Sequence, residues 1–267
     1  MASETRPETR PWAIVTGAST GIGYELAKQC RDNGFDLLIA ADEPEIEQAA
    51  ASLRQDGVSV EPVQADLSGT AGVDKLYAAA KGRKVTALLA NAGRGLGRAF
   101  LDQDPADWRR VVDTNVTGTL LLVQKVGRDM RAAGAGRILI TGSIAGFVPG
   151  TYQAVYNASK AFLDSFSFAI RHELKASGVT VTCLMPGVTE TDFFERADMM
   201  DTKVGTAAKK DDPAMVAKKG FDAMMRGEGD VVTGWHNKLQ SAIANFLPSG
   251  VTAALHQGMA EPGTAKG

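Results

Sequence analysis

The chain has 267 residues, of which 44% are hydrophobic and 22% are charged, and its formal net charge is −2. This length suffices for one large domain with a substantial core. The near balance of 29 basic and 31 acidic residues argues against nucleic acid as a main partner. No apolar run approaches the ~18 residues of a membrane span, and residues 1–11 lack the apolar stretch of a secretory signal. We therefore expect a cytoplasmic protein with no membrane partner.

Strand-like and helical patterns alternate along the chain, which predicts one α/β domain: a doubly wound parallel sheet of about seven strands with helices on both faces. The expected strands lie near residues 12–16, 36–40, 58–63, 85–90, 137–141, 179–185 and 230–233. The expected helices lie near residues 21–33, 43–55, 70–81, 106–131, 153–176 and 213–226. We expect a single domain over residues 1–267, with flexible tails at 1–10 and 259–267.

The first expected strand leads into a glycine-rich turn with the spacing G-x-x-x-G-x-G, and a helical pattern follows. Glycines let the backbone approach a diphosphate closely, and the free N–H groups at a helix N-terminus face the anion. Such a turn alone is often only a turn, but its place after the first strand favours a nucleotide site. The candidate residues are Gly17, Ser19, Thr20, Gly21, Ile22 and Gly23.

Tyr156 and Lys160 lie four residues apart in an expected helix, and Ser143 follows the strand at 137–141. Side chains at i and i+4 share a helix face ~6 Å apart, and an ammonium group favours the phenolate form of a nearby tyrosine. A serine hydroxyl can donate to a substrate oxygen while the tyrosine transfers a proton. Each feature alone is a common surface pair or turn residue. Tyr152 lies eight residues from Lys160 and is less well placed.

Together with Asn91-Ala92-Gly93, Asn115 and Pro186-Gly187, these segments resemble the short-chain dehydrogenase/reductase family over roughly residues 11 to 235. The motifs stand in the family's order and at its spacing. The resemblance implies a Rossmann-type fold and hydride transfer between a nicotinamide cofactor and a secondary alcohol, ketone or aldehyde. It implies a catalytic tetrad of Asn115, Ser143, Tyr156 and Lys160.

The resemblance also implies further roles. In the family, the asparagine matching Asn115 helps hold a water that extends a proton path from the lysine, and the lysine contacts the nicotinamide ribose. Two residues have an equally ordinary interpretation as helix caps, Asp66 and Thr191. The remaining cofactor contacts, besides the glycine turn, Tyr156 and Lys160, are Asp42, Asp66, Leu67, Asn91, Ala92, Gly93, Pro186, Gly187, Val188 and Thr191.

The choice between NAD and NADP is expected at the end of the second strand, where Asp42 and Glu43 follow Ala41. A carboxylate there accepts from the adenosine ribose, whereas an arginine holds a 2′-phosphate. Family members that select NAD usually carry Asp at the position of Ala41, so Asp42 must reach from one residue further on. At ~6 Å and an effective dielectric of ~20, the repulsion between one of these carboxylates and each negative charge of a 2′-phosphate costs ~3 kcal/mol before salt screens it. We predict that NAD binds at least ~10-fold more tightly than NADP.

The candidate substrate residues are mostly apolar, which suggests a medium-sized apolar or amphipathic carbonyl compound. They are Arg94, Gly95, Ile144, Ala145, Gln153, Met185, Phe193 and Phe194. Residues 188–212 lack a steady periodicity, which fits a lid over the substrate as well as a plain loop. The three histidines show no metal-ligand spacing, and we expect Cys30 and Cys183 to be buried, reduced thiols. No metal site is expected.

Three expectations concern assembly and class. The segments 106–131 and 153–176 are apolar around most of their circumference, and family members pair these helices, so we expect a homodimer or homotetramer. Residues 238–247 predict an amphipathic helix that packs on its own domain, or docks on a subunit or a membrane surface. The alternative function is a catalytically silent dinucleotide-binding regulator or scaffold, and the complete Ser143, Tyr156 and Lys160 set favours the enzyme.

Overall fold

Seven strands form one parallel sheet in the order β3-β2-β1-β4-β5-β6-β7 in the computed structural model, which describes residues 10–55, 57–233 and 248–265. The strands are β1 Trp12–Thr16, β2 Asp36–Ala41, β3 Val60–Gln64, β4 Val85–Ala90, β5 Gly136–Thr141, β6 Val179–Met185 and β7 Asp230–Val232. The chain first extends the sheet from β1 towards β3 and then restarts on the other side of β1 with β4. The loops after β1 and β4 therefore diverge and leave a crevice at the carboxyl edge.

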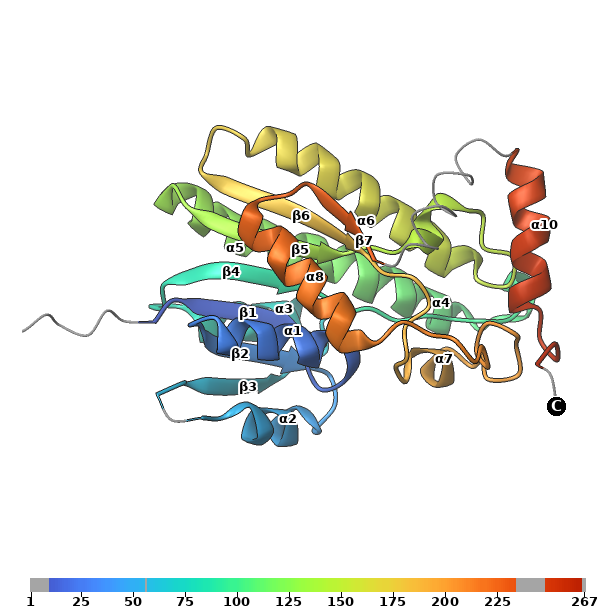
Figure 1. Cartoon of the computed structure of the whole chain (residues 1–267), viewed down its shortest axis with the longest axis horizontal. Helices are drawn as coiled ribbons and strands as arrows, with labels where there is room; N and C mark the ends of the chain where they lie inside the picture. The colour runs from blue at the N-terminus through green and yellow to red at the C-terminus, as the bar shows by residue number, and fades with distance from the viewer. Residues whose placement is uncertain (1–9, 56, 234–247, 266–267) are drawn as a thin grey trace, which may run out of the picture.

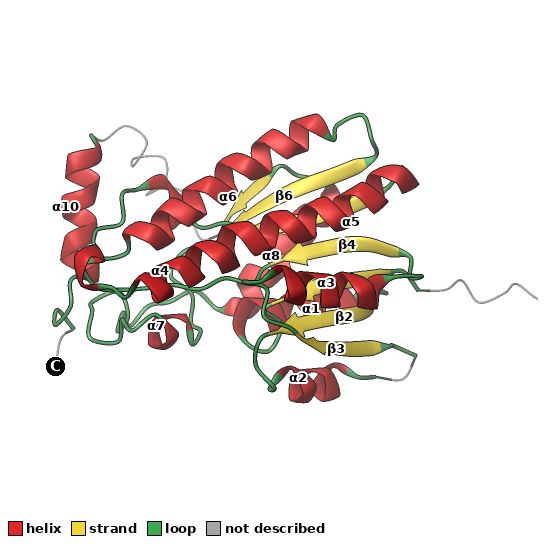
Figure 2. Ribbon diagram, turned by 180° about the vertical axis from the view of Figure 1, so that it is seen from behind, coloured by secondary structure: helices red, strands yellow, loops and turns green. Residues whose placement is uncertain are grey.

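Helices cover both faces of this sheet. α1 (Gly21–Asp32), α2 (Ile46–Leu53) and α8 (Pro213–Arg226) pack on the face seen in Figure 1. The opposite face, seen in Figure 2, carries α3 (Thr70–Ala80), α5 (Thr119–Ala133) and α6 (Ala154–Glu173). The prediction of a doubly wound parallel sheet with about seven strands is confirmed.

Strand β2 shows why these strands appear as unbroken apolar runs. Leu37 and Ile39 pack into the core under α1 and α8, whereas Leu38 and Ala40 pack into the core on the opposite face. All four side chains are fully buried. Because successive side chains point to opposite faces, a strand covered on both sides must be apolar at every position.

The helix predicted over 106–131 is present, but it contains a π-helical turn that was not predicted. The structure has α4 (Pro105–Val112), a π-helical turn (Asp113–Gly118) and then α5. Gly118 lies so close to the neighbouring loop that a Cβ there would come 2.0 Å from the Leu67 carbonyl oxygen. The wider turn also lets Asn115 bond to groups outside its own helix, and such π turns recur at functional sites.

The C-terminal part also differs from the prediction. Helix α10 (Ser249–Ala260) was not predicted, and residues after it, predicted as a flexible tail, hydrogen-bond to Asp201 through the backbone N–H groups of Gly263 and Ala265. The predicted helix at 238–247 and the tail at 1–9 lie outside the described residues. None of the described helices is long and apolar enough to cross a bilayer.

Candidate active site

The carboxyl ends of the central strands open on a cavity of about 370 Å³. Nearly all the predicted catalytic, cofactor and substrate residues line it, including both residues of the tyrosine–lysine pair. Three predicted residues do not line it, Gly21, Asn115 and Met185. For Met185 the substrate prediction is wrong, because its side chain is 1% exposed at the end of β6 and belongs to the core of the sheet.

The glycine turn between β1 and α1 is built for close approach. Gly17 and Gly21 have left-handed φ angles of 63° and 56°, which favour glycine. A Cβ at Gly23 would come 1.9 Å from the Gly17 carbonyl oxygen. Thr20 precedes α1 without capping it through its side chain, so the first N–H groups of the helix stay available to a ligand. This cradle fits the diphosphate of a dinucleotide.

The Gly23→Ala variant should bind the cofactor at least ~10-fold more weakly, because a clash of this size shifts the turn and overpacking costs ~1–3 kcal/mol. The matched control is Gly258→Ala, since a Cβ on that exposed glycine of α10 meets no atom within 4 Å. Fluorescence titration with the cofactor measures the affinity of both variants. Unchanged affinity in the Gly23 variant would show that the turn does not hold the diphosphate.

The tips of three strands are tied together beside this turn. The Thr16 hydroxyl at the end of β1 accepts from the backbone N–H groups of Asn91 and Ala92, both at 3.0 Å. The Asn91 amide donates to the Thr16 carbonyl oxygen at 3.2 Å and accepts from the Thr141 hydroxyl at 3.0 Å. These bonds fix β1, β4 and β5 and leave Ala92 and Gly93 as a small, flat surface. Sequence reasoning picked out the Asn91 segment but not its link to Thr141.

The tyrosine, lysine and serine meet on one wall of the cavity. The Lys160 ammonium lies 5.9 Å from the centre of the Tyr156 ring and donates to the Thr141 carbonyl oxygen at 2.8 Å. The Ser143 hydroxyl accepts from the backbone N–H of Ala145 at 3.1 Å. The side chains of Tyr156, Lys160 and Ser143 are all buried. Tyr156 and Lys160 therefore share a helix face, as their spacing predicted, and Ser143 lies just after the end of β5.

Burial decides the protonation of this group. It raises the pKa of Tyr156 to about 12, although contact with the Ser143 hydroxyl works in the opposite direction. Burial also lowers the pKa of Lys160 to about 8, against the attraction of the Asp164 carboxylate. The lysine alone therefore does not ionise the tyrosine. Without a further positive charge, Tyr156 keeps its proton at neutral pH and is ready to donate it.

Asn115 does not line the cavity, but its hydrogen bonds hold segments that do. Its side chain is fully buried in the π turn, accepts from the Arg94 N–H at 2.7 Å and donates to the Arg94 carbonyl oxygen at 2.9 Å. It also donates to the Ser159 hydroxyl at 2.9 Å. Both amide hydrogens are thus used to hold the segment after Gly93 against α6. The water-holding role implied by the family stays a prediction.

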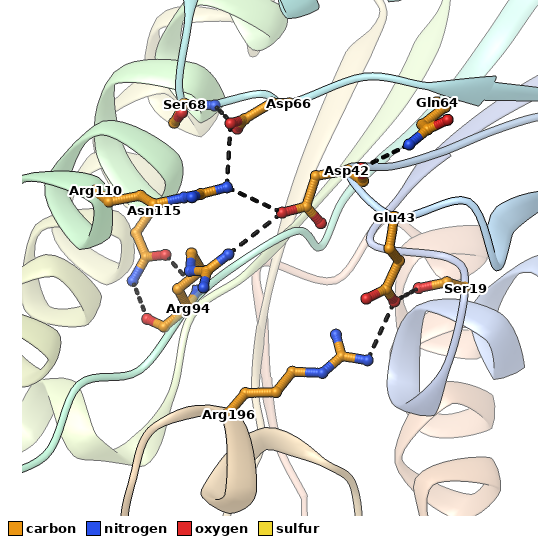
Figure 3. A network of polar contacts seen from close by, with 10 residues as sticks. All are labelled: Ser19, Asp42, Glu43, Gln64, Asp66, Ser68, Arg94, Arg110, Asn115 and Arg196. Atoms are coloured by element: carbon orange, nitrogen blue, oxygen red, sulfur yellow. Dashed lines mark hydrogen bonds and ion pairs between the residues drawn. The ribbon is translucent and has the colours of Figure 1, made fainter. Parts of the chain in front are cut away.

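Three arginines gather at the end of the cavity where the adenosine is expected (Figure 3). One carboxylate oxygen of Asp42 pairs with Arg94 at 3.3 Å and with Arg110 at 3.4 Å, and Arg110 also reaches Asp66 at 3.2 Å. Arg94, predicted as a substrate contact, is thus turned towards the cofactor end. These arginines come from segments far from β2 in the sequence, so local reading missed them.

The second acid at this end is Glu43. Its carboxylate accepts from the Ser19 hydroxyl at 2.5 Å and pairs with Arg196, on the short helix α7 (Phe193–Arg196), at 3.1 Å. The acidic pair Asp42 and Glu43 is therefore largely neutralised, which weakens the repulsion of a 2′-phosphate expected from the sequence.

Asp66 makes a local turn rather than a helix cap. Its carboxylate accepts from the Ser68 N–H at 3.0 Å, while the residue before α3 is Gly69. Although partial burial works to raise it, the pKa of Asp66 lies below its usual value because of the Ser68 hydrogen bonds and the nearby Arg110. Asp66 stays ionised on the cavity wall, where the adenine is expected.

The substrate end is closed by residues of the predicted lid, 188–212. The Phe193 ring lies 5.0 Å from the Tyr156 ring, and the Thr191 hydroxyl accepts from the Phe193 N–H at 3.4 Å, although the N-cap residue of α7 is Asp192. Buried residues of the lid form a small apolar cluster with α10, made of Phe194, Ala197, Met199 and Ala260. Residues His256 and Met259 of α10 also line the cavity, and no sequence signal predicted either.

The fold and the site define a nicotinamide-dependent oxidoreductase. The family model described as "short chain dehydrogenase" matches residues 11–201, and the chain belongs to the short-chain dehydrogenase/reductase family. It therefore acts on small carbonyl or alcohol substrates.

Known relatives extend over most of the chain. An uncharacterized oxidoreductase from Myxococcus xanthus is 32% identical over 248 residues, which is 89% of this chain and 92% of the relative. A short-chain dehydrogenase from Sphingobium yanoikuyae in complex with NADPH has a TM-score of 0.79 at 28% identity, covering 88% of this chain and 94% of that one. A family member from Burkholderia phymatum in complex with NAD has a TM-score of 0.76 at 25% identity, covering 87% and 92%. Structures of relatives thus exist with either cofactor bound.

Proposed function

We propose that the protein transfers a hydride between NAD and a secondary alcohol or the matching ketone, or an aldehyde, with Tyr156 as the general acid and base. The observation that carries this proposal is the meeting of buried Tyr156, Lys160 and Ser143 on the wall of a cavity that begins at the glycine turn. A catalytically silent regulator would need the glycine turn to bind the cofactor, but it would not need Tyr156, Lys160 and Ser143.

The residues divide the work in a simple way. A bound nicotinamide ring supplies or accepts the hydride, and its oxidised form carries a positive charge. In carbonyl reduction, Tyr156 donates its proton to the substrate oxygen, and the Ser143 hydroxyl donates to the same oxygen and polarises it. The raised pKa keeps this proton in place until the oxygen becomes basic. In alcohol oxidation Tyr156 must first lose the proton, which the charge of Lys160 assists.

A preference for NAD is supported by the geometry of Asp42. The guanidinium groups of Arg94 and Arg110 bind the same carboxylate oxygen of Asp42, Oδ2, and hold it in place. The other oxygen, Oδ1, has no partner among the described residues, and Asp42 lines the cavity, so this oxygen can accept from a ribose hydroxyl. A 2′-phosphate would have to displace this carboxylate to reach the two arginines.

A neutral, medium-sized apolar carbonyl compound is the proposed substrate. The wall around Tyr156 carries Ile144, Val188, Phe193 and Phe194, and the guanidinium group of Arg94, which also lines the cavity, is paired with Asp42. The test is a cofactor titration followed by turnover of a panel of ketones, aldehydes and secondary alcohols that vary in size and charge. Neutral apolar ketones should turn over fastest. Cofactor binding without turnover of any compound would favour the regulator instead.

A homodimer or homotetramer is proposed from the surface of α6. Phe162 and Phe168 are 43% and 42% exposed, and Phe162 stacks on Phe166 with ring centres 6.1 Å apart. Phe162 and Phe166, four residues apart, share one face of α6, and an exposed aromatic face favours burial against another subunit. Two buried thiols, Cys30 and Cys183, fit the proposed cytoplasmic location.

Sedimentation at micromolar concentration should show a species of two or four 28.1 kDa chains. The Phe162→Glu variant should shift this species towards the monomer, because a charge buried in an apolar contact is costly. The control is Leu101→Glu, since Leu101 is 92% exposed and lies outside α6. A wild-type protein that sediments only as a monomer would refute the assembly.

A further inference from the structure

Helix α10 closes the substrate end of the cavity, although it lies far from the catalytic residues in the sequence. Figure 1 shows α10 at the end of the molecule, on the side of α4 and α7 and away from β3. His256 and Met259 face the cavity from this helix. The His256 side chain is nearly buried, with 8% of the residue exposed. A buried histidine on a cavity wall, outside the reacting group, calls for a physical role.

The hydrogen bonds of His256 define its form. Its Nδ1 lies 3.0 Å from the carbonyl oxygen of Thr151, and a carbonyl oxygen can only accept, so Nδ1 carries the hydrogen. Its Nε2 then accepts from the Asn157 amide, whose nitrogen lies 3.4 Å away. The same amide nitrogen donates to the Val148 carbonyl oxygen at 3.1 Å. The neutral imidazole therefore joins the loop 148–153 to the first turn of α6, next to Tyr156.

Two more bonds connect α10 with this loop. The Thr151 hydroxyl donates to the Ala253 carbonyl oxygen at 2.8 Å, and the Tyr152 hydroxyl donates to Glu261, just after α10, at 3.2 Å. Tyr152 has a φ of 64°, a left-handed conformation that a non-glycine residue keeps only when its surroundings hold it. The loop before Tyr156 is thus held in a strained shape by contacts from the C-terminal helix.

Burial also suits the neutral form of His256. It lowers the pKa of the imidazole, against the hydrogen bond to Thr151. The ring can therefore keep one donor and one acceptor nitrogen, which is what its two partners require.

We propose that His256 is a positioning residue: by joining Thr151 to Asn157 it holds the loop 148–153 as a wall of the substrate pocket and sets the place of Tyr156. The role rests on the proposed function for its effect on turnover, but the hold on the loop exists without any substrate. Gln153 and Val148 of this loop line the cavity, so a displaced loop changes the shape of the pocket itself.

Two readouts test the proposal in the full-length protein. In His256→Ala, hydrogen–deuterium exchange of the segment 148–157 should speed up at least ~10-fold, because the loop loses its tie to α10. The KM of the best ketone of the panel should rise ~10-fold with a smaller fall in kcat, since misplacing a pocket wall weakens productive binding. Affinity for the cofactor should stay within about twofold, because the glycine turn lies elsewhere.

Three further variants make the test specific. His256→Gln keeps a donor and an acceptor and should restore most of the protection and the KM. Thr151→Val removes the hydroxyl bond to Ala253 of α10, keeps the His256 bond to the Thr151 carbonyl oxygen, and should move both readouts in the same direction as His256→Ala but less far. Leu255→Ala, next to His256 but 60% exposed, should change neither. Exchange and KM both unchanged in His256→Ala would overturn the proposal, whatever Thr151→Val shows.

The outcomes separate this proposal from the proposed function. If the wild type turns over no carbonyl or alcohol, the function fails, while the exchange data still decide whether His256 holds the loop. If turnover is found but exchange of 148–157 is indifferent to His256, only the positioning role is lost.

Discussion

The Tyr156→Phe variant should lose ~10²-fold or more of its turnover, because the change removes the proton donor and keeps the ring. Affinity for the cofactor should remain nearly unchanged, since the glycine turn and the tied strand tips do not involve the phenol oxygen. Steady-state kinetics on the best substrate of the panel, with a cofactor titration beside them, measure both quantities. The matched control is Tyr77→Phe, whose phenol donates to Asp129 and does not line the cavity.

The lysine should behave differently from the tyrosine. Lys160→Ala removes a buried ammonium that donates to the Thr141 carbonyl oxygen, and the family's lysine also contacts the nicotinamide ribose. Both turnover and cofactor affinity should therefore fall. Near-wild-type turnover in the Tyr156 variant would remove the proposed mechanism, whatever the lysine variant shows.

The second large effect is expected in cofactor choice. The wild type should bind NAD at least ~10-fold more tightly than NADP. In Asp42→Arg this ratio should narrow or invert. In Asp42→Ala, Arg94 loses its carboxylate partner and Arg110 keeps only Asp66, so both guanidinium groups can turn towards a 2′-phosphate. Such a pair at ~4 Å is worth ~4 kcal/mol at an effective dielectric of ~20, before exposure and salt reduce it.

A double variant shows whether the arginines carry that gain. Adding Arg110→Ala to Asp42→Ala should return much of the lost discrimination, because one of the two guanidinium groups is gone. Calorimetric titration of the cofactor-free protein with NAD and NADP gives the ratios. Tighter binding of NADP by the wild type would mean that the 2′-phosphate displaces the Asp42 carboxylate from Arg94 and Arg110.

The strands and the glycine turn were predictable because their signals are local. Leu37 to Ala40 are apolar at every position, as a strand covered on both faces requires, and the order of strand, turn and helix marks the nucleotide site. Tyr156 and Lys160 were also within reach, because the helical repeat alone puts them on one face. Their protonation was not, since burial decides it and burial depends on the whole fold.

The features that were missed depend on contacts between distant segments. Arg94, Arg110 and Arg196 neutralise Asp42 and Glu43 from three separate elements, so the two acids appeared unpaired in the linear sequence. The π turn arises where Asn115 bonds to Arg94 and Ser159, and α10 has its role only through bonds to the loop before Tyr156. No periodicity records such contacts.

The most direct test of the central claim follows the hydride itself. NADH carrying deuterium at both positions of the reactive ring carbon is incubated with the enzyme and the best ketone, and the alcohol formed is examined by mass spectrometry. We expect one deuterium on the carbinol carbon with the wild type, and a rate of deuterium transfer at least ~10²-fold lower with Tyr156→Phe. A wild-type protein that binds NADH tightly yet transfers no deuterium to any ketone or aldehyde of the panel would contradict it.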